Sequence, residues 1–185
     1  MVAEVFRQGK YSVTPVTMDD FDEIVEHLSK ENVEELMLLG YSSYREAIRD
    51  MILTAECYIA RKEGQPFTFV GGLWPDPDLG PPQMFALFSS DLRKNFVSIA
   101  KGSKALLKMF DQYHDTLSMT ILAKNEAMLN WATWLGFVPD AINEQGLQQY
   151  VSFVRCITPK TNVYTGESRP VMHWKARMDT LVDVK

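Results

Sequence analysis

Four carboxylates beside predicted strand ends are the side chains of this chain best placed to do chemistry. They are Glu56, Asp76, Asp78 and Asp91. A carboxylate at the end of a strand can take a proton from a substrate amine and so act as a general base. Because isolated acidic residues in such positions are mostly solvated, we favour surface side chains over a catalytic base.

Histidines and cysteines form no recognisable catalytic or metal-binding pattern. His27, His114 and His173 lie far apart in the sequence, without the spacing of metal ligands, so we expect surface or helix-end positions. Cys57 and Cys156 both lie in apolar, strand-like runs, which predicts buried, reduced thiols. The sequence also contains no Walker loop and no Ser-His-Asp order. We therefore predict no metal site.

Changes in hydrophobic period define the elements that would position these residues. Thr17 is predicted to cap a helix, with Asp20 as its capping-box partner. Either Ser42 or Ser43 is predicted to cap a later helix, and Gly136 to end the last one. Strands are predicted over 11–16, 57–61, 67–74, 84–88, 117–122, 138–142 and 148–157, and further helices over 33–39, 96–113 and 125–135.

Length and charge indicate a globular protein without a general affinity for polyanions. The chain has 185 residues and a formal net charge of -5, with lysines and arginines scattered along it. No apolar run approaches the roughly 20 residues that a membrane helix needs. Residues 1–10 carry charges and no apolar core, so we expect no signal peptide and synthesis in a cytosol.

Composition divides the chain into three predicted segments. Residues 1–10 are expected to form an N-terminal arm, residues 11–157 one domain, and residues 158–185 a C-terminal extension. The extension lacks a clean hydrophobic period, apart from a short helix predicted over 174–181, and its role is not indicated.

The order of these elements resembles the GNAT fold of acetyl-CoA-dependent N-acyltransferases. The most specific match is residues 125–137, which resemble the family segment that begins with Asn, continues as a helix and ends in Leu-Gly-Phe. In the family this helix follows a splayed strand and packs beside the pantetheine arm of the cofactor. The resemblance implies an α+β domain over residues 11–157, with a mixed, mostly antiparallel twisted sheet flanked by helices. An ordinary amphipathic helix ended by glycine is the alternative explanation of the local match.

The resemblance also exposes a missing catalytic group. Many family members carry a tyrosine four positions before the glycine, and its phenol protonates the leaving thiolate. The corresponding residue is Ala132, and the neighbouring Thr133 faces another side of the helix. We therefore predict no catalytic residue.

The family's pyrophosphate loop, Arg/Gln-x-x-Gly-x-Gly/Ala, aligns with residues 98–103. Its glycines let backbone N–H groups approach the phosphates at a helix N-terminus. Here the first glycine is replaced by Lys101, and only Gly102 and Ser103 remain small. Lys101 could contact phosphate or simply form a solvated helix face.

A further departure lies upstream of this loop. The apolar run 96–100 predicts that the helix begins earlier, near residues 89–91, which would leave no open anion site at Lys101. Lys101, Gly102, Ser103 and Asn125 are therefore predicted to be remnants of a cofactor site.

A closer resemblance covers roughly residues 57–155. Residues 84–93 and 104–117 resemble the small internal virion or morphogenesis proteins of T7-like short-tailed phages, which carry a degenerate GNAT-like domain. The shared features are a strand ending in a Ser-Ser-Asp turn, a lysine-rich central helix and an Asp-Thr-Leu entry to the next strand. The resemblance implies an oligomeric structural role with other virion proteins, at the portal or internal core, in a particle made in the host cytoplasm.

Three functions follow from these observations. A non-catalytic bacteriophage virion protein that needs no cofactor is the expected one. An acetyl-CoA-dependent acyltransferase with an atypical site is the first alternative, because some family members work without the tyrosine. A host-directed binding or inhibitor module is the second.

Overall fold

The computed structural model describes residues 6–38, 40–74, 81–91, 95–145 and 148–156. The chain divides into two compact units: unit one comprises Met1–Asp76 and Met84–Phe110, and unit two comprises Pro77–Gln83 and Asp111–Lys185. The predicted extension over 158–185, with its short helix and His173, lies outside the described residues, as do Asp76 and Asp78. No described helix is long and apolar enough to cross a membrane.

Unit one is built on a sheet whose strands follow their order in the chain. They are β1 (Phe6–Gln8), β2 (Tyr11–Pro15), β3 (Glu56–Lys62), β4 (Phe67–Trp74) and β5 (Gln83–Phe88). The pairs from β1 to β4 are antiparallel. β1 was not predicted, because three residues are too few to show a period. Its pairing with β2 through Gly9, at φ 60°, brings part of the expected arm into the sheet.

The described residues of unit one form five helical segments: η1 (Met18–Asp20), α1 (Phe21–His27), α2 (Lys30–Leu38), α3 (Tyr44–Thr54) and α4 (Phe96–Phe110). Two predicted caps are confirmed. The Asp20 carboxylate accepts from the Thr17 N–H at 2.7 Å, and the Ser43 hydroxyl accepts from the Glu46 N–H at 3.2 Å. α2 begins three residues earlier than predicted, because the Ser29 hydroxyl accepts a hydrogen bond from the Asn32 N–H in the first turn of the helix.

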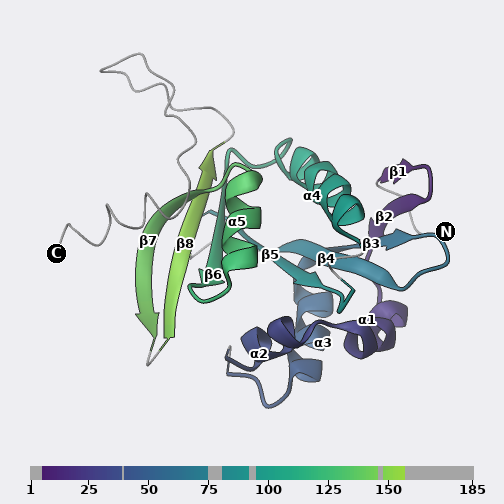
Figure 1. Ribbon diagram of the computed structural model, residues 1–185, viewed down its shortest axis with the longest axis horizontal. Helices are drawn as coiled ribbons and strands as arrows, with labels where there is room; N and C mark the ends of the chain where they lie inside the picture. Colours follow the sequence, from purple (N-terminus) through teal and green to yellow (C-terminus); the bar gives the residue numbers. More distant parts are fainter. Residues whose placement is uncertain (1–5, 39, 75–80, 92–94, 146–147, 157–185) are drawn as a thin grey trace. The chain divides into compact units, whose positions relative to one another are not determined.

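Side chains of the unit-one sheet alternate between two helix layers, with α1–α3 on one face and α4 on the other (Figure 1). Ile59 packs with α1–α3, whereas Ala60 lies beside α4. On β4 the alternation is broken by a bulge at Thr68, because Ala60 pairs with Phe69 but Arg61 pairs with Phe67. A bulge inserts one residue and re-aims the next side chain, so that Phe69 points towards α4.

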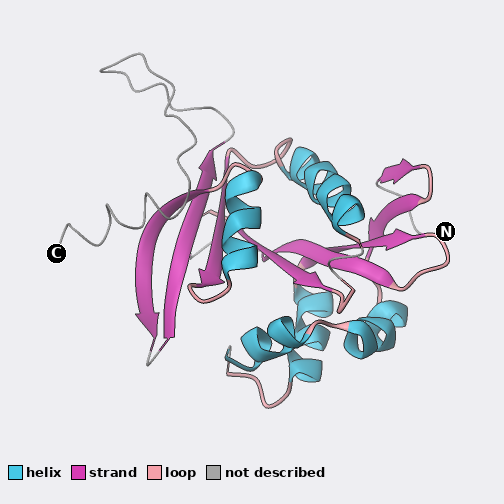
Figure 2. Ribbon diagram, in the orientation of Figure 1, coloured by secondary structure: helices cyan, strands magenta, loops and turns pink. Residues whose placement is uncertain are grey.

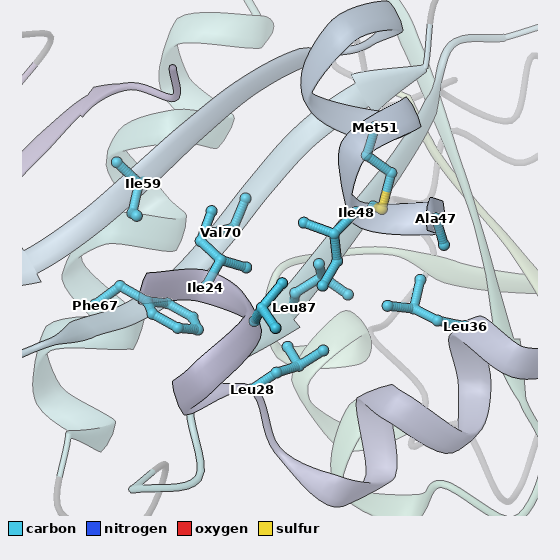
Figure 3. Close-up of a cluster of buried hydrophobic side chains, with 11 residues drawn as sticks. Ile24, Leu28, Leu36, Ala47, Ile48, Met51, Ile59, Phe67, Val70 and Leu87 are labelled. Atoms are coloured by element: carbon cyan, nitrogen blue, oxygen red, sulfur yellow. The ribbon is translucent and has the colours of Figure 1, made fainter. Parts of the chain in front are cut away.

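A buried cluster holds α1–α3 against the sheet (Figure 3). Its members are almost completely excluded from solvent and come from all three helices and from β3, β4 and β5. Truncating one such large aliphatic side chain to alanine typically costs about 2–5 kcal/mol. The cluster comprises Ile24, Val25, Leu28, Leu36, Ala47, Ile48, Met51, Ile59, Phe67, Val70 and Leu87.

An ionic network joins α1 to the β3–β4 hairpin. One Arg61 amino group lies 2.6 Å from Asp20 and 2.6 Å from Glu23. Glu23 also accepts the Phe67 N–H at 2.7 Å. All three charged side chains are mostly buried, so their charged groups form ion pairs with one another in place of hydrogen bonds to water.

The described part of unit two contributes three strands to the eight-stranded sheet and contains one helix. β6 (Thr116–Leu122), β8 (Gln148–Cys156) and β7 (Val138–Gln145) pair antiparallel in that order, and α5 (Glu126–Trp134) connects β6 to β7. Gln83 pairs in parallel with Ser118. Arg155 binds the Asp111 carboxylate through both terminal nitrogens. The predicted fold class, α+β with a mixed, mostly antiparallel sheet flanked by helices (Figure 2), is confirmed.

The two cysteines lie in different environments. Cys57 is buried as predicted, and its thiol donates to the Met51 carbonyl at 3.3 Å. Burial raises the pKa of the Cys57 thiol to about 12, with a contribution from Glu56. Cys156 is exposed, so the prediction that it is buried was wrong. It is the last residue of β8, and an apolar run does not show where a strand leaves the core.

Alkylation should separate these thiols. We expect iodoacetamide at mildly alkaline pH to modify Cys156 in the native protein and to spare Cys57, because only an exposed thiolate reacts. Mass spectrometry should find one modification in the native protein and two after denaturation. Fast native labelling of Cys57 would contradict the described burial, and Cys156→Ser should abolish native labelling.

Candidate cofactor site

The helix that would carry a phosphate loop begins two residues before the predicted motif at 98–103 and therefore includes all of it. α4 starts at Phe96, and the Asn95 carbonyl accepts from the Ile99 N–H at 3.0 Å. The start predicted near residues 89–91 is wrong, because Ser89 instead donates its N–H to the Thr68 carbonyl at 3.1 Å. The related expectation, that the helix begins before Lys101, is confirmed.

Lys101, Gly102 and Ser103 therefore lie in the second turn of α4. Only the first few N–H groups of a helix are free to bind an anion. Beyond that turn each N–H donates to the carbonyl four residues earlier. The backbone at these three positions is already hydrogen-bonded and does not form a phosphate loop.

Gly102 is required by packing against the sheet. A Cβ at this position would lie 2.6 Å from Cε1 and 3.1 Å from Cζ of Phe69, and 3.4 Å from Cβ of Ala60. Phe69 is itself fully buried, so its ring has little room to move. The glycine lets α4 approach β4 closely.

The neighbours of Gly102 point in other directions. Lys101 is exposed, and its Nζ lies 5.7 Å from the centroid of the Tyr11 ring, within cation–π range. Ser103 is fully buried, and its hydroxyl has no hydrogen-bond partner among the described residues. The three side chains of the predicted remnant do not converge on a common point.

The edge of β5 opposite β4 is also occupied within unit one. The Phe88 N–H donates to Oδ1 of Asn32 at 2.7 Å, and the Phe88 carbonyl accepts from the Ser29 N–H at 2.9 Å. The Ser90 N–H donates to the His27 carbonyl at 2.9 Å. An extended ligand with amide groups, such as a pantetheine arm, would need such edge groups for strand-like pairing. At this end of β5 they are already paired.

In unit two, Asn125 and Gly136 serve as helix caps. The Asn125 side chain accepts from the Met128 N–H at 3.3 Å, which is the role of an N-cap. Gly136 has a φ of 89°, and the Phe137 N–H donates to the Ala132 carbonyl at 3.0 Å. This is the glycine-terminated C-cap that the sequence predicts.

Ala132 brings no functional group to α5. It is fully buried, and the adjacent Thr133 hydroxyl donates to the Leu129 carbonyl at 2.9 Å. A tyrosine at position 132 would have to place a large ring where a methyl group is enclosed.

Of the carboxylates singled out from the sequence, Glu56 and Asp91 are described and both are exposed. Glu56 accepts from the Tyr58 phenol at 2.6 Å. His27 is the last residue of α1, a predicted helix-end position, and His114 lies between α4 and β6. Among the described residues no group of three His, Cys, Asp or Glu could hold a metal ion.

Ser29 and Asn32 were missed by sequence reasoning, although they leave a signal. Ser29-Lys-Glu-Asn32 has a cap residue followed three positions later by an amide. The Asn32 side chain is 2% exposed and accepts from both Phe88 and the Ser29 hydroxyl. An amide in the first turn of an amphipathic helix indicates a buried polar contact, but its partner is remote in sequence and could not be inferred.

Solved structures with similar folds include several that are named as acetyltransferases. RimL, a ribosomal L7/L12 alpha-N-protein acetyltransferase, superposes with a TM-score of 0.66 at 11% identity, over 85% of this chain and 96% of that one. A GNAT-family acetyltransferase from Bacillus anthracis gives 0.61 at 10% identity, over 81% and 96%. The ribosomal-protein-S5-alanine acetyltransferase from Vibrio fischeri gives 0.59 at 10% identity, over 91% and 100%.

These comparisons define the class of fold. The chain has a GNAT-like fold, as its element order predicts. No protein-family model matches the sequence, and neither does any curated protein. At 10–11% identity the similarity carries the fold and not the chemistry. The residues at 98–103 do not fit the pyrophosphate of acetyl-CoA, because their backbone is helical and Gly102 faces the sheet.

Substitution tests the packing role of Gly102. We expect Gly102→Ala to lower the free energy of unfolding by about 1–2 kcal/mol, because overpacking against Phe69 outweighs the better helix propensity of alanine. Urea denaturation measures the change.

A double-mutant cycle supplies the control. In a Phe69→Leu background, Gly102→Ala should cost much less, because the smaller side chain leaves room for the added methyl. An equal cost in both backgrounds would show that the Phe69 contact is not the reason for the glycine.

Proposed function

We propose that this chain is a non-catalytic assembly protein with a GNAT-like fold, acting as a structural component of a bacteriophage virion. The observation that carries the proposal is the position of Lys101–Ser103 in the second turn of α4. A phosphate loop needs backbone N–H groups that are free, and these are committed to the helix.

Three further observations support the absence of acyl-transfer chemistry. Gly102 is enclosed by Phe69, the edge of β5 at Phe88 is paired with Ser29 and Asn32, and Ala132 offers no proton donor. At each of these positions the chain makes packing contacts or hydrogen bonds with itself, where a cofactor site would present groups to a ligand.

The virion role rests on the resemblance of residues 57–155 to phage morphogenesis proteins. It implies other virion proteins as partners, at the portal or internal core, and particles made in the host cytoplasm. A structural role requires a stable fold and a binding surface but no cofactor site. The packing of Gly102, Ser103 and Ala132 agrees with such a role.

The second candidate is an acetyl-CoA-dependent N-acyltransferase. It is favoured by the solved structures of similar fold, which are named as acetyltransferases. Its cofactor would have to bind without the loop at 98–103.

Calorimetric titration with acetyl-CoA decides between the candidates. We expect no binding heat and no rise in melting temperature at millimolar ligand. A native-state site saturated about 100-fold above its Kd would instead add about 2.7 kcal/mol of stability. An active N-acetyltransferase of the same fold, run in parallel, serves as the positive control. One-to-one binding would overturn the non-catalytic assignment and call for an amine-substrate screen.

Particle composition tests the structural role. We expect mass spectrometry of purified particles from the virus that encodes this chain to find it in a fixed copy number per particle. Its retention after repeated washing at low salt with mild detergent would distinguish a built-in component from protein adsorbed on the particle surface. Absence from purified particles would contradict the virion role, whatever the acetyl-CoA result.

A further inference from the structure

The outward face of α4 is basic with an apolar end. Lys101, Lys104 and Lys108 are exposed at helical spacing, and α4 contains no acidic residue. At its N-terminal end Phe96 is 62% and Val97 58% exposed. A large ring and a branched aliphatic side chain on the surface of a protein often mark an interaction site.

The outward face of α2 has the opposite character. Glu31 and Glu34 are exposed at adjacent turns, with Glu34 3.9 Å from Lys30 in a solvent-exposed pair. Met37 and Leu38 follow at the C-terminal end and are 43% and 38% exposed. After Lys30, the first residue of α2, the α2 face runs from acidic to apolar along the chain, whereas the α4 face runs from apolar to basic.

The spacing of the two faces matches when the helices run antiparallel. From Val97, lysines follow four and seven residues later, at Lys101 and Lys104. From Leu38, glutamates precede by the same four and seven residues, at Glu34 and Glu31. Val97 can then meet Leu38, Lys101 can meet Glu34 and Lys104 can meet Glu31 in a single register.

We propose that α4 of one copy of this chain docks antiparallel on α2 of a second copy. A second copy is the partner because charge, apolar ends and spacing match between two helices of the same sequence. Opposite charges fix the register and speed the encounter, and the apolar ends supply the burial. The proposal names a partner for the assembly role proposed above and rests on it for its biological meaning.

The position of the two helices determines what such docking builds. α2 and α4 lie on opposite faces of the unit-one sheet, so α4 cannot dock on α2 of the same copy (Figure 1). A contact between two different surfaces is heterologous, and repeating it gives a closed ring or an open filament rather than a two-fold dimer.

Sedimentation of the full chain over a concentration series tests the docking. We expect the average mass to rise with concentration at about 0.05 M salt and to fall when salt is raised to about 0.5 M, because exposed ion pairs are screened. Lys101→Glu/Lys104→Glu and, separately, Glu31→Lys/Glu34→Lys should each weaken self-association by about tenfold or more.

Mixing the two variants gives the decisive readout. Each reversed face complements the reversed face of the other variant, so the mixture should associate more strongly than either variant alone. Damage to folding cannot produce that rescue. Lys10→Glu/Lys124→Glu, which makes the same change in net charge outside α4, should associate like the wild type.

Two results would overturn the proposal. One is a chain that stays monomeric in every condition, and the other is association that no charge reversal affects. Neither result would change the interpretation of the acetyl-CoA titration, which separately tests the non-catalytic role.

Discussion

The close approach of α4 to β4 at Gly102 is the constraint on which the rest of unit one depends. It requires a residue without a side chain on the helix and a ring, Phe69, on the strand. The bulge at Thr68 turns that ring to the α4 face while Phe67 and Val70 remain in the cluster beneath α1–α3. One inserted residue thus lets a single strand supply both cores, and the Arg61 network holds the start of the same strand to α1 through the Phe67 N–H.

The same contact explains why a glycine that resembles a phosphate-loop residue does different work here. In a loop, glycine exposes backbone N–H groups to a ligand. In the second turn of a helix those groups are already bonded, and the missing side chain faces the sheet. The residue type is retained while its physical role changes from ligand approach to packing. A motif is therefore informative only together with the local backbone that it occupies.

Element type was predictable where the period was long or a cap was present. The hairpin of β3 and β4, the Ser43 and Gly136 caps and the helix after Asn125 follow from local rules. The three residues of β1 carry no such signal, and the start of α4 depends on Ser89 pairing with Thr68, a long-range contact. Cys156 and Asn32 show the same limit, since an apolar run or a capped helix does not reveal which neighbours will cover it. That Lys101, Gly102 and Ser103 face in different directions could be seen only once the extent of α4 was known.

A helix whose inner side packs closely on a sheet can vary on its outer side alone. The inner side of α4 is fixed by Gly102, Leu106 and Phe110, all of them buried. Its outer side carries lysines and exposed apolar residues that contribute little to the core, so substitutions there cost little stability. Such a side can acquire charge complementary to another surface without disturbing the fold. In a protein whose overall charge is negative, a basic stripe on one helix favours contact with an acidic surface, and the acidic helix α2 lies on the opposite face of the unit-one sheet from α4.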